Sequence, residues 1–145
     1  MANLLSRFNK EVIGSDNTIY DYLAKITAIG DFKRVKNIDV IITSWNNILM
    51  TARRTYNMDP EYGSDLHLIL YEPVDETTVE RIKTEVESRI RLYDDRATIE
   101  DIEVVLNSNL KGFTINVFVE YEGETKTLSV KFDDSIVVKQ QGAAI

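Results

Sequence analysis

The sequence predicts an α+β protein in which two main helices pack on a small three-stranded antiparallel sheet, with extended arms at both ends of the chain. Apolar residues recur every three or four positions in two segments of the first two-thirds of the chain, which is typical of amphipathic helices. The last third alternates apolar and polar residues around the hairpin signal Glu122-Gly123, as expected for antiparallel strands. A chain of 145 residues has the length of a single domain.

A short strand is expected near residues 32–35, and the first main helix is expected from about Ile38 to Thr51. Asn37 stands directly before this helix, where an asparagine side chain can cap the first turn. Large apolar residues recur along the helix at a spacing that places them on one face. They are Ile38, Ile41, Ile42, Trp45, Ile48 and Leu49. Many of them are β-branched, which lowers helix propensity, so packing must supply the stability of this helix.

Turn-forming residues separate the two main helices. Residues 52–63 contain a proline and Gly63 and are predicted to form a loop. Ser64 is expected to cap a short helix over residues 65–70. Pro73 ends that helix, because the residue before a proline is biased away from the helical conformation.

The longest predicted helix is capped by Asp75 or Thr77 and runs to about Tyr93. Its apolar residues are three or four positions apart and are Val79, Ile82, Val86, Ile90 and Tyr93. The opposite face is polar, and Glu87 and Arg91 are four positions apart, which suits an ion pair. This pattern predicts a helix with one buried face and one solvated face.

The last third of the chain is predicted to form a three-stranded meander. The first strand is expected from about Ile99, the second over Phe113–Tyr121 and the third over residues 127–132. Alternate residues of the second strand share one apolar face, namely Phe113, Ile115, Val117, Val119 and Tyr121. A sheet of three strands leaves outer edges that invite pairing with another chain unless they are covered.

Domain boundaries are predicted at residues 1–30 for an N-terminal arm, 31–133 for the central domain and 134–145 for a C-terminal arm. Both arms carry apolar residues, which usually need a partner surface. These residues are Leu4, Leu5 and Phe8 in the N-terminal arm and Ile136, Val137 and Val138 in the C-terminal arm. We expect both arms to mediate assembly, and the C-terminal one can add as a strand to a sheet edge.

The composition excludes several classes of function. The formal net charge is −7, which argues against binding nucleic acid or an anionic membrane surface, because such partners require a basic face. The chain has no cysteine, and its single histidine, His67, has no histidine or cysteine partner for a zinc site. No metal or other cofactor is therefore expected. Neither a signal peptide nor a membrane span is predicted, so we expect a soluble protein made in the cytoplasm.

Acidic residues near the predicted helix ends raise one enzymatic alternative. Glu72, Asp94 and Asp95 supply carboxylates, and a glycosidase needs two of them at a defined separation, one with a raised pKa. Helix caps, solvated ends or ion-pair partners are the favoured interpretation, and no catalytic residue is predicted. Arg96 follows two acids, so its guanidinium is expected to be held by Asp94 or Asp95 and to reach a partner. Arg53-Arg54 is a short basic pair that can contact a partner carboxylate, but a solvated helix end is the favoured interpretation.

Four short segments, in their order and spacing, resemble a known family. Asn47–Thr51 match Asn-Ile/Leu-Leu-x-Thr at a helix end, Pro60–Ser64 match Pro-x-Phe/Tyr-Gly-Ser, and Tyr71–Pro73 match an aromatic-acid-Pro segment. Asp94–Arg96 align with a Glu-Pro-Arg signature at the end of the long helix. Over roughly residues 30–132, the chain resembles the baseplate wedge proteins of phages, including those described as lysozyme-like. It is similar in the same way to the homologous wedge component of type VI secretion systems.

One segment departs from the family pattern, since Asp95 stands where the family has proline and Asp94 replaces glutamate. An acid followed by Arg96 is kept, but the rigid helix stop is lost. The resemblance implies a structural role without enzymatic activity. It also implies that the central domain, 31–133, is similar to the conserved domain of the sheath subunit. Asp94, Asp95 and Arg96, together with Glu72, are predicted to contact partners, foremost the core helical bundle of the wedge.

The resemblance further implies that the tail sheath protein is a partner and that several copies of the chain form a symmetric ring. The first sheath ring would assemble on this template by strand exchange, with main-chain hydrogen bonds between neighbours. The protein would be made in the host cytoplasm and assembled in a virion tail baseplate or an equivalent injection particle; which kind of machine stays open. Two alternatives are a tail-associated, muramidase-like peptidoglycan hydrolase, using Glu72 with Asp94 or Asp95, and a generic cytoplasmic adaptor.

Overall fold

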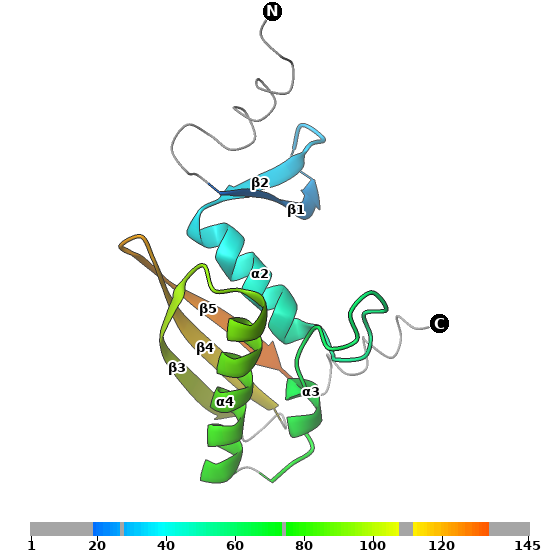
Figure 1. Ribbon diagram of the computed structural model, residues 1–145, viewed down its shortest axis with the longest axis vertical. Helices are drawn as coiled ribbons and strands as arrows, with labels where there is room; N and C mark the ends of the chain where they lie inside the picture. The colour runs from blue at the N-terminus through cyan, green and yellow to red at the C-terminus, as the bar shows by residue number, and fades with distance from the viewer. Residues whose placement is uncertain (1–18, 27, 74, 108–111, 134–145) are drawn as a thin grey trace, which may run out of the picture. The chain divides into compact units, whose positions relative to one another are not determined.

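The computed structural model describes residues 19–26, 28–73, 75–107 and 112–133 (Figure 1). The chain divides into two compact units, Met1–Thr43 and Ser44–Ile145. The boundary falls inside helix α2 (Ile38–Met50), whose first half belongs to the first unit. The α+β prediction is confirmed, with two main helices and a three-stranded antiparallel sheet.

The first unit contains a two-stranded antiparallel sheet made of β1 (Tyr20–Ile26) and β2 (Phe32–Lys36). Strand β2 lies where the sequence predicts a strand. Strand β1 was not predicted, because its apolar residues follow neither a helical nor an alternating pattern. The backbone amide of Asn37 donates to the carbonyl of Ile19 at 2.8 Å and extends this ladder by one bond.

Helix α2 begins directly after Asn37, as predicted. Asn37 has a positive φ of 52°, which asparagine tolerates better than most residues. Its carbonyl accepts the first backbone bonds of the helix, from the amides of Val40 at 3.0 Å and Ile41 at 3.4 Å. The fully buried large residues of α2 are Ile38, Ile41, Trp45, Ile48 and Leu49, so five of the six predicted apolar positions are core positions. Ile42 is half-buried.

The second unit contains α3 (Leu66–Ile69) and the long helix α4 (Glu76–Tyr93). The predicted cap is confirmed at Asp75, whose side chain accepts a hydrogen bond from the amide of Thr78 at 2.8 Å. The buried face of α4 is formed by Thr78, Ile82, Val86 and Ile90. The exposed face carries the predicted ion pair between Glu87 and Arg91, with 2.6 Å between their side chains.

The three-stranded sheet has the order β3 (Thr98–Asn107), β4 (Gly112–Tyr121) and β5 (Glu124–Phe132). The predicted hairpin turn joins β4 to β5, and both Glu122 and Gly123 have positive φ, at 50° and 81°. These values belong to the two-residue turn that matches the natural twist of a hairpin. The meander is therefore as the sequence predicts.

The core of the second unit lies between α4 and one face of this sheet (Figure 1). Residues paired across the strands share that face, as Val117 does with Ile102 on β3 and Leu128 on β5. The buried residues of the sheet are Ile102, Phe113, Ile115, Val117, Val119, Leu128, Val130 and Phe132. This continuous apolar face fixes the register, because a slip of one residue would turn every side chain to the opposite face.

Candidate functional site

The end of helix α4 brings two of the predicted site residues together. Asp94 is the C-cap of α4, and its amide donates to the carbonyl of Ile90 at 2.8 Å. The two carboxylate oxygens of Asp94 accept from the guanidinium of Arg96, one from Nε at 2.8 Å and the other from Nη2 at 2.6 Å. The backbone amide of Arg96 donates to the same carboxylate at 3.1 Å. The guanidinium and the carboxylate thus form a two-pronged, charge-assisted contact, which is among the stronger polar contacts in proteins.

Asp94 is a buried charge, with 8% of the residue exposed. Burial by itself would raise the pKa of Asp94, because it penalises the charged form. Hydrogen bonds from the side chain and backbone of Arg96, the charge of Arg96, and a hydrogen bond from Ser44 in α2 outweigh that effect. The pKa of Asp94 therefore lies below its ordinary value, and the carboxylate is charged at neutral pH.

Asp95 and Arg96 are the solvent-exposed residues of this segment. Asp95 is exposed, and 36% of the Arg96 side chain is accessible. A hollow of about 360 Å³ lies beside them, lined by Ile90, Arg91, Asp94, Asp95, Ala97, Thr98 and Ile99. The acid-acid-arginine segment is consequently the rim of a surface depression between the end of α4 and the start of β3.

Glu72 does not join this group. It forms an ion pair with Arg81 near the start of α4, whereas Asp94 lies at the opposite end of the helix. A helix of 18 residues is roughly 27 Å long, far more than the 5–9.5 Å that separates the two carboxyls of a glycosidase. Asp94 is also fully engaged by Arg96. Glu72 with Asp94 or Asp95 therefore lacks the arrangement that sugar hydrolysis requires.

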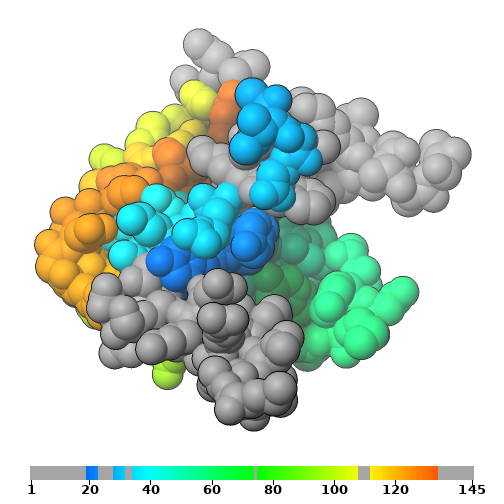
Figure 2. Space-filling model, turned by 90° about the horizontal axis from the view of Figure 1, so that it is seen from above, coloured from blue at the N-terminus to red at the C-terminus, as the bar shows by residue number. Residues whose placement is uncertain are grey.

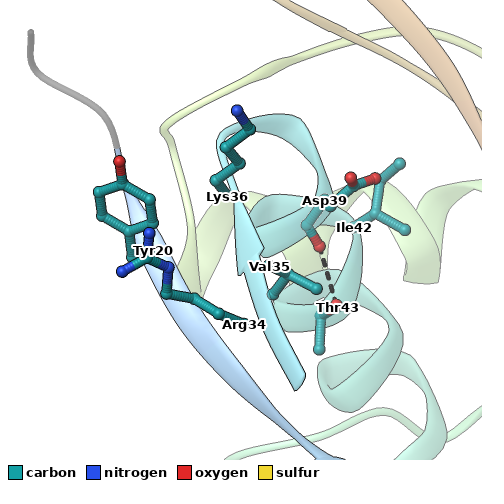
Figure 3. Close-up of a pocket in the computed structure, with 7 residues that line it drawn as sticks. All are labelled: Tyr20, Arg34, Val35, Lys36, Asp39, Ile42 and Thr43. Carbon is teal, nitrogen blue, oxygen red and sulfur yellow. Dashed lines mark hydrogen bonds between the residues drawn. The ribbon is translucent and has the colours of Figure 1, made fainter. Parts of the chain in front are cut away.

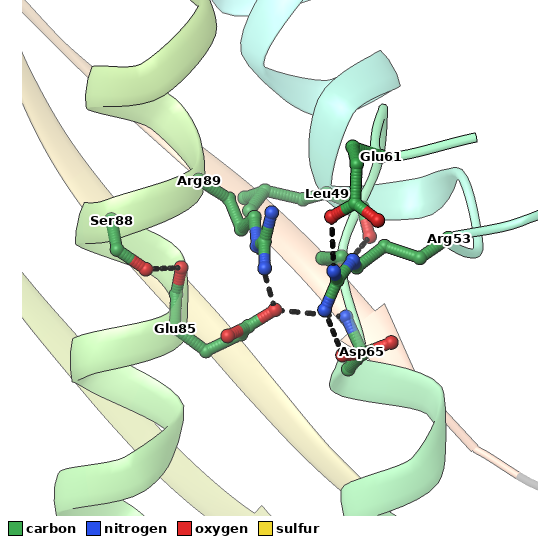
Figure 4. A network of polar contacts seen from close by, with 8 residues as sticks. Leu49, Arg53, Glu61, Asp65, Glu85, Ser88 and Arg89 are labelled. Carbon is green, nitrogen blue, oxygen red and sulfur yellow. Dashed lines mark hydrogen bonds and ion pairs between the residues drawn. The ribbon is translucent and has the colours of Figure 1, made fainter. Parts of the chain in front are cut away.

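Sequence reasoning missed a second polar cluster, in the loop between α2 and α3. Arg53 donates to the carboxylate of Asp65 at 2.7 Å and also binds Glu61 (Figure 4). The prediction of a solvated helix end is wrong for Arg53, since only 17% of its side chain is exposed. Hydrogen bonds to Glu61 and Asp65 raise the pKa of Arg53 further. The available signal was the pair of acids on either side of Gly63.

This cluster ties the loop to helix α4. The amide of Asp65 donates to the carboxylate of Glu85 at 2.9 Å, and the same Glu85 oxygen accepts from Arg89 at 3.2 Å (Figure 4). The prediction that Ser64 caps α3 is also wrong. Asp65 occupies the cap position without a side-chain cap bond. The buried Ser64 hydroxyl instead donates to the carbonyl of Leu49 at 2.7 Å and fastens the loop to the end of α2.

The loop presents aromatic and apolar side chains. Tyr62 lies against both Tyr56 and Tyr93, with ring centroids 5.6 Å and 5.1 Å apart. Burial raises the pKa of Tyr62, so its hydroxyl stays protonated at neutral pH. Beyond this aromatic cluster, Met58 is 85% exposed. The loop projects from the surface in Figure 1, and it forms the teal-green spheres of Figure 2.

The remaining predicted features add no chemistry to this surface. His67 is half-buried within α3. Within the described ranges, no group of three or more His, Asp or Glu side chains is placed to hold a metal ion. No helix in the part of the chain that the structure describes is long and apolar enough to cross a membrane. The predicted arm residues Leu4, Leu5, Phe8, Ile136, Val137 and Val138 lie outside the described residues.

Several solved structures share this fold. A protein of Geobacter sulfurreducens provisionally described as a tail lysozyme is 21% identical, with a TM-score of 0.59 over 66% of this chain and 88% of that chain. A chain of the post-contraction baseplate of pyocin R2 is 18% identical, with a TM-score of 0.52 over 80% and 99%. A chain of the six-fold symmetrised baseplate of the anti-feeding prophage is 12% identical, with a TM-score of 0.57 over 84% and 94%.

The sequence itself decides the family. No curated protein matches the chain, but the family model for baseplate wedge protein gp25 matches residues 37–126, which is more than half of the chain. The matched range contains all four segments on which the resemblance rests, including the buried Asp94 contact and the Gly63-Ser64 anchor. The chain therefore belongs to the gp25 family of baseplate wedge proteins, structural components of contractile tails and related particles.

Proposed function

We propose that this chain binds the core helical bundle of the baseplate wedge through Asp94–Arg96 and serves as the template on which the first sheath ring assembles. The observation that carries the proposal is the locked Asp94–Arg96 contact. Both oxygens of a buried carboxylate hold the guanidinium, so little side-chain freedom is lost when Arg96 meets a partner. Exposed Asp95 stands at the family's proline position and adds a second acid to the same rim. Glu72, which is half-buried and paired with Arg81, is a secondary contact.

Strand exchange is the proposed means of assembly. Within the described residues, the outer edges of β1–β2 and of β3–β4–β5 have no neighbouring strand, and such edges are templates for an added chain. The arms, residues 1–30 and 134–145, supply the added strands, although Tyr20–Ile26 of the first arm already forms β1. We propose several copies in a symmetric ring, as in the six-fold symmetrised relative. The sheath protein is the second partner, and the particle assembles from protein made in the host cytoplasm.

Arg96→Ala is expected to weaken binding to the wedge core bundle by about tenfold or more, because charge-assisted bonds to a partner are lost. The measurement is the dissociation constant for purified core-bundle subunits, by calorimetry. Arg54→Ala is the matched control, since Arg54 is an exposed arginine that does not line this hollow. Equal affinity of the Arg96 variant and the wild type would contradict the proposed contact.

Removal of either arm is expected to reduce incorporation of the chain into baseplates. Residues 1–18 and 134–145 are the segments to delete, because removing all of residues 1–30 would also remove β1. Incorporation is measured by quantitative mass spectrometry of purified particles, and sheath attachment by electron microscopy. Normal incorporation and normal sheath attachment in both deletion variants would refute strand exchange by the arms.

A further inference from the structure

The first unit contains a hollow of about 600 Å³ beside strand β2, which neither the family match nor the wedge contact accounts for (Figure 3). Residues from both strands and from the start of α2 line it. They are Tyr20 of β1, Arg34, Val35 and Lys36 of β2, and Asp39, Ile42 and Thr43 of α2. Val35, with 9% of its surface exposed, and half-buried Ile42 give the hollow an apolar floor. Its rim is polar.

The rim is positively charged although the chain as a whole carries −7. Arg34 and Lys36 are both exposed, and neither forms an ion pair with any residue that the structure describes. Asp39, the one acid in the lining, is already engaged in an interaction of its own. The Thr43 hydroxyl donates to the carbonyl of Asp39 at 2.8 Å. Among the described residues, the charges of Arg34 and Lys36 beside the hollow are therefore not neutralised by an ion pair.

The Tyr20 ring positions the guanidinium of Arg34 at the rim of the hollow. Its guanidinium carbon lies 4.3 Å from the centroid of the Tyr20 ring, which is a cation–π contact, and Figure 3 shows the two side chains together. No hydrogen bond or ion pair with a described residue occupies the guanidinium N–H donors of Arg34, and these donors match the two oxygens of a carboxylate. Tyr20 pairs with Lys36 across the sheet, so Arg34, Lys36 and Tyr20 share one face of the hairpin.

We infer that this hollow binds an acidic, extended segment of a partner protein, with Arg34 holding one carboxylate in a two-pronged contact and Lys36 holding a second. The cationic rim is complementary to acids, and the net charge of the chain disfavours nucleic acid as the anionic partner. The segment is extended because three consecutive residues of β2, Arg34–Lys36, line the hollow, and a sheet of only two strands gains stability from a further strand. The inference rests on the proposed strand exchange and adds that the incoming strand is acidic.

The test uses the full-length protein and a synthetic peptide, so it does not require baseplate assembly. The probe is a blocked heptapeptide of alternating valine and acidic residues, and the control replaces Glu and Asp by Gln and Asn. Dissociation constants come from NMR titration of the isotopically labelled protein. The acidic peptide is expected to bind at least about tenfold more tightly than its neutral control, with amide shifts concentrated in residues 34–43.

Substitutions in the lining decide the assignment. Arg34→Gln is expected to weaken binding of the acidic peptide by about tenfold, and Lys36→Gln to weaken it less. Arg54→Gln is the matched control and leaves binding unchanged, since exposed Arg54 lines neither hollow. If Arg34→Gln fails to fold, Arg34→Lys keeps the charge, loses the two-pronged geometry and is still expected to bind more weakly. Equal binding of the two peptides, unchanged binding by the Arg34 variants, or tighter binding of a twelve-nucleotide oligothymidine would overturn the inference. Normal peptide binding together with failed baseplate incorporation would instead fault the proposed function alone.

Discussion

Gly63→Ala is expected to destabilise the second unit by roughly 3 kcal/mol, as the sum of backbone strain and overpacking. Gly63 has a φ of 113°, a conformation that residues with a side chain rarely adopt. A Cβ at this position would overlap the carbonyl oxygen of Thr51 and lie 3.0 Å from its carbonyl carbon. That oxygen accepts the amide of Ser64 at 2.9 Å, so it cannot move away without breaking the loop anchor.

Gly123→Ala is the matched control, because it introduces the backbone strain of a positive φ without the steric overlap of an added Cβ. Gly123 also has a positive φ, 81°, but nothing lies within 4 Å of an added Cβ. Its substitution is expected to cost only about 1 kcal/mol. Urea unfolding followed by the fluorescence of Trp45, the single tryptophan and a fully buried one, reports on the second unit in both variants. Equal shifts of the two midpoints would show that the contact of Gly63 with Thr51 is unimportant.

The elements that the sequence predicts well are those whose signal is local. The buried face of α4 and the alternation along β4 both come from apolar spacing, and the Glu122-Gly123 turn comes from backbone preference alone. Asp75 was identifiable as a cap because its carboxylate accepts a hydrogen bond from a backbone amide in the first turn of the helix, that of Thr78. In each case the residues that determine the structure are within a few positions of one another, so the pattern is readable without a fold.

The features that escaped prediction depend on residues brought together by folding. Strand β1 has no alternation of its own and exists because β2 pairs with it. Arg53 is taken out of solvent by Asp65, twelve residues away, and by the anchoring of that loop to α4. The pairing of Asp94 with Arg96 was predictable from their adjacency, but the burial of Asp94 was not, because it requires α2 beside the end of α4.

Arg96→Ala is expected to reduce the free energy of unfolding of the second unit by about 2 kcal/mol at neutral pH, the typical worth of hydrogen bonds to a buried charge. The substitution removes both guanidinium donors from the buried carboxylate of Asp94 and leaves it the amide of residue 96. Asp94→Asn is expected to cost less, because the partly exposed guanidinium of Arg96 can turn to water. Adding Asp94→Asn to Arg96→Ala should therefore restore part of the lost stability, since the uncompensated charge is removed.

The pH dependence of these variants distinguishes a buried charge from simple loss of packing. In the wild type the pKa of Asp94 is lowered on folding, so its contribution to stability is complete above the unfolded value of about 3.9 and is lost as the pH falls through the folded pKa. In Arg96→Ala, burial dominates and raises the folded pKa of Asp94 above the unfolded value. Folding of that variant then takes up a proton near pH 4, and its stability falls as the pH rises through the raised pKa.

The difference in unfolding free energy between the wild type and Arg96→Ala should consequently be small near pH 4 and grow toward its full value by pH 7. Urea unfolding monitored by Trp45 fluorescence at half-unit steps of pH measures this difference directly. The Asp94→Asn/Arg96→Ala double variant has no carboxylate to titrate at this site, so its difference from the wild type should stay constant between pH 5 and pH 7. A constant difference for Arg96→Ala over the same range would mean that Asp94 reaches water once Arg96 is gone, and that Arg96 merely covers the acid rather than neutralising it.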